Sequence, residues 1–355
     1  MRAMRAEGFR GYQDLKLADI PKPRVSEGRV LVKIAAAGVT PLDHTILSGG
    51  YPRAKAPLVL GSEGAAVVED ANGSEFSVGA RVMFTGPYGV SGDGAYSEYL
   101  AVRRENLSLI PGSIEHVSAA GIPVAYLTAH MALTLSGFQA GKTVLSPAIG
   151  GSVGNAVTQL ARALGARHAM STTTSHAKAE QARILGFDEV IDLSTEKLGE
   201  GVRRITGGYG SDLVIDAMGG DILSEALGTL AMSGSLTTLG YSAGRKSTID
   251  VTDLIWKRAG IKSLSLFAQP PAMWSTAWAS IFALLESGAI RPIVVKNTFA
   301  LRQSFARIVP VDSCHPSEQS SARRCWPQRP EAPWHRRRPS KIARRWRPIR
   351  SMRCR

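Results

Sequence analysis

Cysteine is absent from the first 313 residues of this 355-residue chain, and Cys314, Cys325 and Cys354 all lie in its last segment. The body of the chain therefore offers neither disulfide bonds nor cysteine ligands for a metal ion. Long apolar runs are also missing, since none approaches the ~18–20 residues that cross a bilayer. No apolar stretch follows the basic residues after Met1, so no secretory signal is predicted. We expect a cytoplasmic protein that does not enter a membrane.

Acidic residues are too few to balance the basic ones, and a net charge of +14 would suit a nucleic-acid-binding protein if it were spread over the chain. The charge is instead concentrated at one end. Residues 308–355 contain thirteen Lys and Arg against three acidic residues, a net charge of +10, which leaves +4 for the preceding 307 residues. Contact with nucleic acid is therefore expected only through this last segment, if at all.

The last segment also loses the periodic pattern of apolar residues. From about Ile308 it is dominated by Pro, Arg, Ser and Trp, a composition that cannot bury enough apolar surface to offset chain entropy. We predict that residues 308–355 form a basic, disordered tail, and the abrupt change in composition is also what a shifted reading frame would produce. Trp326, Trp334 and Trp346 among its arginines keep a rival function open, in which the tail binds nucleic acid through phosphates and base stacking.

The body of the chain is predicted to form two domains. Short strand-like runs separated by Gly and Pro extend from Val30 to about Leu109, which indicates a β-rich, barrel-like domain. Strands and helices then alternate over about 120 residues, a pattern typical of a doubly wound parallel sheet. We expect strands at 30–34, 65–69, 81–84, 143–146, 168–172, 189–192, 212–216, 235–239, 262–266 and 293–295, and helices at 153–164, 176–185 and 274–286.

A glycine-rich turn at residues 148–154 carries the strongest functional signal. Its glycines follow the apolar strand at 143–146 and open the next helix, which is the context of a dinucleotide-binding turn. Small residues let the backbone approach a pyrophosphate, and the unpaired N–H groups and dipole of the helix favour its negative charge. Because further strand–helix units follow, we interpret the turn as a dinucleotide site rather than as a simple tight turn.

The end of the next strand indicates which dinucleotide is bound. An NAD site usually has an acidic residue about 20 residues further on, where it binds the ribose 2′-hydroxyl. Here the region contains Thr172, Ser175 and Lys178, and no Asp or Glu lies between His168 and Lys178. Hydroxyl groups and an ammonium favour a 2′-phosphate, so the sequence predicts NADPH. The alternative is that Ser175 only caps the next helix, with Lys178 on its solvated face.

Several motifs, in order along the chain, resemble the medium-chain dehydrogenase/reductase superfamily and, within it, the zinc-independent quinone oxidoreductase-like branch. They are Ala36–Asp43, Ser48–Pro52, Leu60–Gly64, Gly92–Tyr99, Ala119–Ala129, Asp216–Gly220 and Leu239–Tyr241. The resemblance implies an α/β fold in which a GroES-like β-barrel catalytic domain spans 1–121 and is completed by 267–307. A Rossmann domain with a doubly wound parallel sheet would then bind NADPH at 122–266.

The zinc ligands of the family are not in place. Zinc-dependent relatives have Cys where Thr40 stands and His where Ser62 stands, and only the carboxylate of Glu63 remains. One carboxylate cannot hold a catalytic zinc ion, which needs about three protein ligands, so no metal site is expected. Without a metal to polarise an alcohol, we expect NADPH to reduce a small molecule that is already electron-poor, a quinone or an α,β-unsaturated carbonyl.

The resemblance also implies the site residues. For catalysis, Thr40 stands where many relatives have Asn beside the nicotinamide. Tyr51 is the remaining candidate for a proton donor, although a Tyr before Pro in a loop is as often a packing residue. The implied cofactor-binding residues are Thr128, Gly151, Ser152, Val153, Gly154, Thr172, Ser175, Lys178, Gly240 and Tyr241.

Three departures from the family pattern keep another function open. Thr45 replaces a tyrosine of some relatives, Leu193 replaces a common adenosine-facing tyrosine, and the family's last strand does not follow Leu301. The chain would then be an NADPH-binding protein with impaired catalysis. Members of this family commonly dimerise, so a homodimer is also an open expectation.

Overall fold

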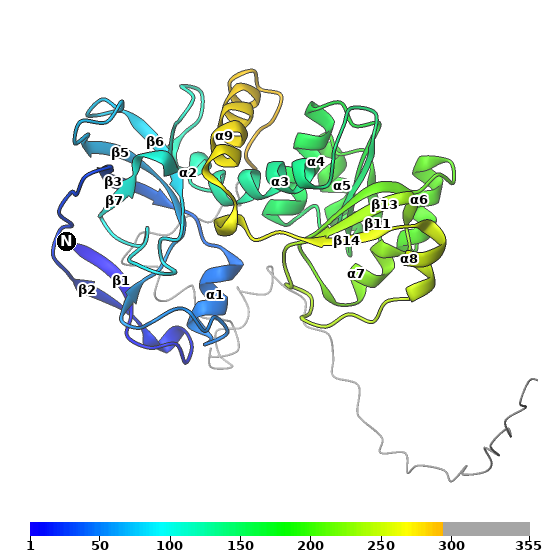
Figure 1. Ribbon diagram of the computed structural model, residues 1–355, viewed down its shortest axis with the longest axis horizontal. Helices are drawn as coiled ribbons and strands as arrows, with labels where there is room; N and C mark the ends of the chain where they lie inside the picture. The colour runs from blue at the N-terminus through cyan, green and yellow to red at the C-terminus, as the bar shows by residue number, and fades with distance from the viewer. Residues whose placement is uncertain (294–355) are drawn as a thin grey trace, which may run out of the picture. The chain divides into compact units, whose positions relative to one another are not determined.

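The computed structural model describes residues 1–293 (Figure 1). The predicted tail at 308–355 lies outside these residues, as do the closing segment beyond residue 293 and all but the first residue of the strand expected at 293–295. Within the described part, no helix combines the length and apolar character needed to cross a membrane.

The first part of the chain forms two antiparallel sheets. Their strands are β1 (Arg2–Ala6), β2 (Leu15–Asp19), β3 (Arg29–Ala37), β4 (Leu58–Val59), β5 (Glu63–Asp70), β6 (Arg81–Thr85), β7 (Tyr99–Arg103) and β8 (Leu107–Leu109). The larger sheet has the order β7-β3-β5-β6-β8 and the smaller one the order β2-β1-β4. The strands expected at 30–34, 65–69 and 81–84 are confirmed as parts of β3, β5 and β6.

The inner faces of these sheets are apolar, as alternating strand patterns require. Val30 and Val32 on β3, together with Val82 and Phe84 on β6, lie in one buried cluster. Each such side chain contributes about 1.5–3 kcal/mol by leaving water. Two short helices, α1 (Pro41–Leu47) and α2 (His116–Ala119), belong to the same part of the chain.

The second part forms a six-stranded parallel sheet. Its strands are β9 (Thr143–Ser146), β10 (His168–Thr173), β11 (Val190–Asp192), β12 (Ser211–Asp216), β13 (Leu230–Thr238) and β14 (Gly260–Ser263), in the order β11-β10-β9-β12-β13-β14. The strand order reverses between β9 and β12. In open parallel sheets, ligands bind at the carboxyl ends of the strands where this reversal occurs. The predicted doubly wound parallel sheet is confirmed.

Helices connect these strands. They are α4 (Ser152–Ala163), α5 (His176–Ile184), α6 (Leu198–Thr206), α7 (Gly220–Leu227) and α8 (Val251–Lys257), with α3 (Pro123–Leu135) before the sheet and α9 (Pro271–Glu286) after it. Helix α3 is apolar on most of its surface, so it must be covered on several sides. Helix α3 contacts both α4 and α9 (Figure 1). Leu127 and Met131 on α3 share a buried cluster with Leu160 on α4 and Ile281 on α9.

One predicted strand is displaced. The apolar residues at 262–266 suggested a strand there, but β14 ends at Ser263, and all four of its residues are exposed. Leu264 and Leu266 are buried because they join the core cluster beyond the strand. The apolar pattern at 262–266 therefore reflects the burial of these two leucines in the core and not a strand.

Candidate functional site

The glycine turn joins β9 to α4 and leaves the start of this helix free. The first helical hydrogen bond runs from the N–H of Asn155 to the carbonyl of Gly151, at 3.0 Å. The N–H groups of Ser152, Val153 and Gly154 precede it and therefore have no partner within the helix, and no side chain caps this end. Gly151 and Ser152 are exposed. The geometry suits an anion at the start of α4.

Gly154 is required by the close contact between α4 and the turn. A Cβ atom there would lie 2.4 Å from the carbonyl oxygen of Ala148 and 2.6 Å from that of Pro147. Both are backbone atoms, so a side chain would have to open the turn. Ala148 itself has a φ of +66°, a conformation that non-glycine residues rarely adopt. The turn is thus held in one specific shape.

Thr172 supports the turn from the neighbouring strand. Its hydroxyl accepts a hydrogen bond from the N–H of Ala148 at 3.0 Å, and its carbonyl accepts one from Ile149 at 2.9 Å. The parallel pairing of β9 with β10 brings these groups together. Because Thr172 is only 2% exposed, its expected contact with a 2′-phosphate stays a prediction.

Ser175 and Lys178 lie at the start of α5, just beyond β10. Ser175 occupies the N-cap position, but its side chain forms no capping hydrogen bond. The alternative, that Ser175 serves only as a helix cap, requires a hydrogen bond of this kind from its side chain. Lys178 is exposed, and the ion pairs of α5 within residues 1–293 involve His176, Glu180 and Arg183 instead. A hydroxyl and an ammonium are therefore available near the carboxyl end of β10.

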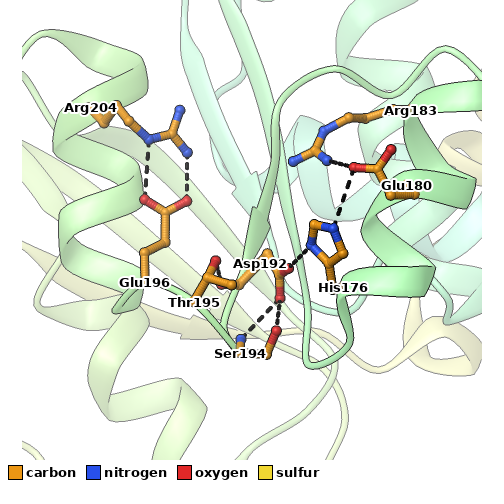
Figure 2. A network of polar contacts seen from close by, with 8 residues as sticks. All are labelled: His176, Glu180, Arg183, Asp192, Ser194, Thr195, Glu196 and Arg204. Carbon is orange, nitrogen blue, oxygen red and sulfur yellow. Dashed lines mark hydrogen bonds and ion pairs between the residues drawn. The ribbon is translucent and has the colours of Figure 1, made fainter.

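An acidic residue that the local sequence pattern does not indicate lies next to this segment. Asp192 ends β11, and the parallel register pairs it with Thr173 at the end of β10. Its carboxylate accepts a hydrogen bond from Nδ1 of His176 at 3.0 Å (Figure 2). Asp192 is not adjacent to this segment in the sequence, but the sheet places the ends of β10 and β11 side by side.

Asp216 organises the loops that follow β12 and β13. Its carboxylate accepts hydrogen bonds from the N–H of Gly219 and the hydroxyl of Thr238, both at 3.1 Å. Burial raises the pKa of Asp216, and these hydrogen bonds oppose that shift. A Cβ atom at Gly240 would lie 2.4 Å from the carbonyl oxygen of Ala217. The two loops thus meet at the carboxyl edge of the sheet, which explains the glycine at 240.

The loop after β13 also reaches the segment that carries Tyr51. Tyr241 is 46% exposed, and the guanidinium of Arg245 lies 5.3 Å from the centre of its ring. A Cβ atom at Gly50 would lie 2.8 Å from a terminal nitrogen of Arg245. Tyr51 is half-buried against an apolar cluster that includes Leu60. This packing accounts for Tyr51 without a catalytic role, which stays a prediction.

Thr40 directly precedes α1, at its N-cap position, and is bonded to a buried carboxylate. Its N–H and its hydroxyl each donate to Oδ2 of Asp43 at 2.8 Å, and the N–H of Gly61 donates to Oδ1 at 3.1 Å. Asp43 is 4% exposed, and this burial raises its pKa against the effect of the three hydrogen bonds. While Asp43 is ionised, the hydroxyl hydrogen of Thr40 points to it rather than to a substrate.

Glu63 begins β5 and connects the larger antiparallel sheet to α3. Its Oε2 accepts a hydrogen bond from the N–H of Val124 at 2.8 Å. Burial raises the pKa of Glu63 to about 8, the bond from Val124 opposes this shift, and the charge of Asp43 adds to it. Close in the sequence, the buried hydroxyl of Ser62 makes no hydrogen bond within residues 1–293. No group of three or more His, Cys, Asp or Glu that could hold a metal ion occurs in the described part.

The substitution Glu63→Gln should flatten the dependence of stability on pH. Between its ordinary pKa of 4.5 and the folded value of about 8, the folded state keeps a proton that the unfolded state has released. The free energy of unfolding should therefore fall as pH rises through this window, by up to about 1.4 kcal/mol per pH unit. Gln cannot ionise but still accepts from Val124. Thermal melts at pH 5, 6.5 and 8 measure the slope, with exposed Glu69→Gln as the control. Equal slopes in wild type and Glu63→Gln would contradict the assignment.

Thr128 is the remaining implied cofactor residue. It lies on α3 and is 5% exposed. The structure thus brings the turn at 150–154, Thr172, Ser175 and Lys178 to the carboxyl ends of β9 and β10, and Gly240 and Tyr241 to the end of β13.

Comparisons with known proteins agree with this geometry. The family model described as "Alcohol dehydrogenase GroES-like domain" matches residues 26–112, and that described as "Zinc-binding dehydrogenase" matches residues 152–283. A quinone oxidoreductase from Pseudomonas aeruginosa is 34% identical over 82% of this chain and 89% of its own length. A 2-haloacrylate reductase from a Burkholderia species is 33% identical over 79% of this chain and 86% of its own length.

A solved structure supports the same grouping. A mycobacterial protein complexed with NADPH superposes with a TM-score of 0.75 at 30% identity, and the match covers 86% of this chain and 94% of the mycobacterial chain. Members of this family use a nicotinamide cofactor, and the glycine turn of this chain fits one. The chain belongs to the medium-chain dehydrogenase/reductase superfamily, in its quinone oxidoreductase-like branch, and is an oxidoreductase of that type.

Proposed function

We propose that this protein is a zinc-independent reductase that uses NADPH to transfer a hydride to a quinone or an α,β-unsaturated carbonyl compound. One observation carries the proposal. The free N–H groups at the start of α4 lie next to β10, and just beyond the end of β10 the start of α5 presents the hydroxyl of Ser175 and the ammonium of Lys178, neither of which is bonded within residues 1–293. The first feature suits a pyrophosphate and the second a 2′-phosphate. The NADPH complex of the mycobacterial relative supports the same choice.

The proposal of zinc independence depends on the side chains at the position of the family's metal site. Thr40 and Ser62 offer only hydroxyl groups, and the hydroxyl of Thr40 is already bonded to Asp43. One oxygen of Glu63 is bonded to Val124. Zinc prefers thiolate, imidazole and carboxylate ligands, so this donor set does not fit it. The proposed reaction therefore involves no metal ion.

NADPH supplies the hydride when it is bound, and the chain supplies binding and orientation. The turn at 150–154 would hold the pyrophosphate, and Ser175 and Lys178 the 2′-phosphate. Thr128 and the loop with Gly240 and Tyr241 would then flank the nicotinamide. With these assignments, the nicotinamide would face the segment that carries Thr40 and Tyr51.

Thr40 would stabilise the oxygen of the acceptor as negative charge develops there. When Asp43 carries a proton, the hydroxyl of Thr40 can accept a hydrogen bond from it and donate its own hydrogen to the acceptor. The raised pKa of Asp43 favours that state. The proton of the product would reach it along the same pair of groups or from solvent.

Two relatives suggest the substrate class. The Pseudomonas relative is named for quinones and the Burkholderia relative for a 2-haloacrylate, which is also an electron-poor alkene. We extend only the shared chemistry to this chain, a conjugated acceptor for hydride. The domain limits at 1–121, 122–266 and 267–307, the homodimer and the cytoplasmic location stay predictions.

The substitution Thr40→Val tests the role of the hydroxyl. Val has the same shape but cannot donate, so we expect kcat/KM for a quinone to fall by roughly 10- to 100-fold, with the Kd for NADPH unchanged. Steady-state kinetics and a fluorescence titration measure the two quantities, and Thr45→Val on the same helix is the control. An unchanged kcat/KM would remove Thr40 from the mechanism.

The reaction itself is tested by mixing purified protein with NADPH and a small panel of quinones and enals, before and after dialysis against a chelator. We expect oxidation of NADPH that the chelator does not reduce. If dialysis abolished turnover and zinc restored it, zinc independence would be wrong. Tight NADPH binding without turnover on any acceptor would instead favour the alternative of a binding protein with impaired catalysis.

A further inference from the structure

A histidine–aspartate pair lies beside the segment that would receive the 2′-phosphate (Figure 2). His176 is the first residue of α5 and directly follows Ser175. Its Nδ1 lies 3.0 Å from Oδ2 of Asp192, which ends the adjacent strand β11. The side chain of His176 is 68% exposed, whereas that of Asp192 is 5% exposed. The ring is therefore the part of the pair that faces solvent.

Asp192 is an ionised hydrogen-bond acceptor in this arrangement. Its Oδ1 accepts from the N–H of Ser194 at 3.0 Å and from the hydroxyl of Ser194 at 2.5 Å. These bonds, with a smaller contribution from His176, hold the pKa of Asp192 below its ordinary value. Because an ionised carboxylate only accepts hydrogen bonds, Nδ1 of His176 must carry the hydrogen.

If the carboxylate of Asp192 had no hydrogen-bond donor beside it, its charge would weaken the binding of NADPH. An acidic residue near the ribose normally selects NAD, because it bonds the 2′-hydroxyl and repels a 2′-phosphate. Asp192 reaches the segment from the neighbouring strand rather than from the usual position. A preference for NADPH therefore requires a hydrogen-bond donor that lies on the Asp192 carboxylate and separates its charge from the phosphate.

We propose that His176 determines cofactor specificity by covering the carboxylate of Asp192, so that the Ser175–Lys178 segment accepts a 2′-phosphate. The inference rests on the proposed preference for NADPH. The imidazole occupies Oδ2, and Ser194 occupies Oδ1, so both carboxylate oxygens are hydrogen-bonded. With His176 removed, the uncovered charge would act against the phosphate.

The other charged groups around His176 are already paired or distant. On α5, Oε1 of Glu180 lies 4.0 Å from Nε2 of His176, and Glu180 also pairs with Arg183. Glu196, which follows β11, is bonded to Arg204 on α6 (Figure 2). Lys178 on the same helix would contact the phosphate itself. Asp192 is thus the carboxylate on which removal of the imidazole acts most directly.

A double-mutant cycle on the full chain tests the proposal. We would measure the Kd of NADPH and of NADH by fluorescence for wild type, His176→Ala, Asp192→Asn and the double variant. The imidazole hydrogen-bonds the carboxylate without removing its charge, so its loss should strengthen the repulsion only in part. We expect His176→Ala to weaken the binding of NADPH by roughly 3- to 10-fold, with little change for NADH. In the Asp192→Asn background the same substitution should change NADPH affinity by less than about twofold.

His168→Ala is the matched control. His168 makes a similar bond, from Nδ1 to Glu189 at 2.6 Å, at the opposite end of β10, and its loss should leave cofactor discrimination unchanged. Thermal melts identify any variant that has lost its fold. If His176→Ala is such a variant, Asp192→Asn alone still tests the proposal, because it should not weaken the binding of NADPH. An equal loss for both cofactors, or the same loss in both backgrounds, would overturn the pair. A wild-type protein without preference for NADPH would instead overturn the proposed cofactor, and the pair with it.

Discussion

Replacing Gly154 by Val should abolish the binding of both NADPH and NADH, with an increase in Kd of at least about 100-fold. The Cβ atom would meet backbone oxygens at 2.4 and 2.6 Å, far inside normal contact distances. Either α4 would move away from the turn, or the turn would open. Both changes displace the free N–H groups that would bind the pyrophosphate, which the two cofactors share.

A matched substitution separates this effect from a general loss of stability. Gly121→Ala adds a Cβ atom with no other atom within 4 Å, so it should leave both affinities within about twofold. Titrations of the two variants, together with their melting temperatures, give the comparison. A Gly154→Val protein that melts like the wild type and still binds NADPH would show that the turn does not hold the cofactor.

Replacing Lys178 by Ala should weaken NADPH by roughly 10- to 100-fold and leave NADH nearly unchanged, because a hydrogen bond to a charged group contributes about 1.5–3 kcal/mol. The ammonium is exposed and takes part in none of the ion pairs of α5 within residues 1–293. Its removal therefore breaks no ion pair among residues 1–293. The preference for NADPH should fall, rather than the affinity for nicotinamide cofactors in general.

The control for this variant must lose the same charge elsewhere. Lys22→Ala removes a lysine that pairs with Glu69 on β5 and should not alter either Kd. Raising the salt concentration should weaken NADPH more in the wild type than in Lys178→Ala, since screening acts on exposed charges. If Lys178→Ala raised the Kd for NADH as strongly as the Kd for NADPH, the lysine would support the fold or bind the pyrophosphate instead of the 2′-phosphate.

The sequence alone predicted the parallel sheet and the turn well, because both depend on local patterns. The apolar strand at 143–146, the glycines at 150–154 and the amphipathic helix after them are contiguous in the chain. Their signals need no knowledge of distant residues. The family resemblance supplied the order of the remaining motifs.

What the sequence could not predict depends on pairing between distant segments. Asp192 reaches the 2′-phosphate segment only because β11 lies beside β10, and a search for acids along one strand end passes over it. Likewise, Thr40 is a donor in the sequence pattern, but its hydroxyl is bonded to Asp43. The raised pKa of Glu63 arises from burial, which composition does not show.

The most direct test of the account is an equilibrium titration of the wild-type protein with NADPH and with NADH, followed by tryptophan fluorescence under identical conditions. The free start of α4, together with Ser175 and Lys178, predicts that both cofactors bind and that the Kd for NADPH is lower by about tenfold or more. A folded protein that binds NADH as tightly as NADPH, or binds neither, would contradict it.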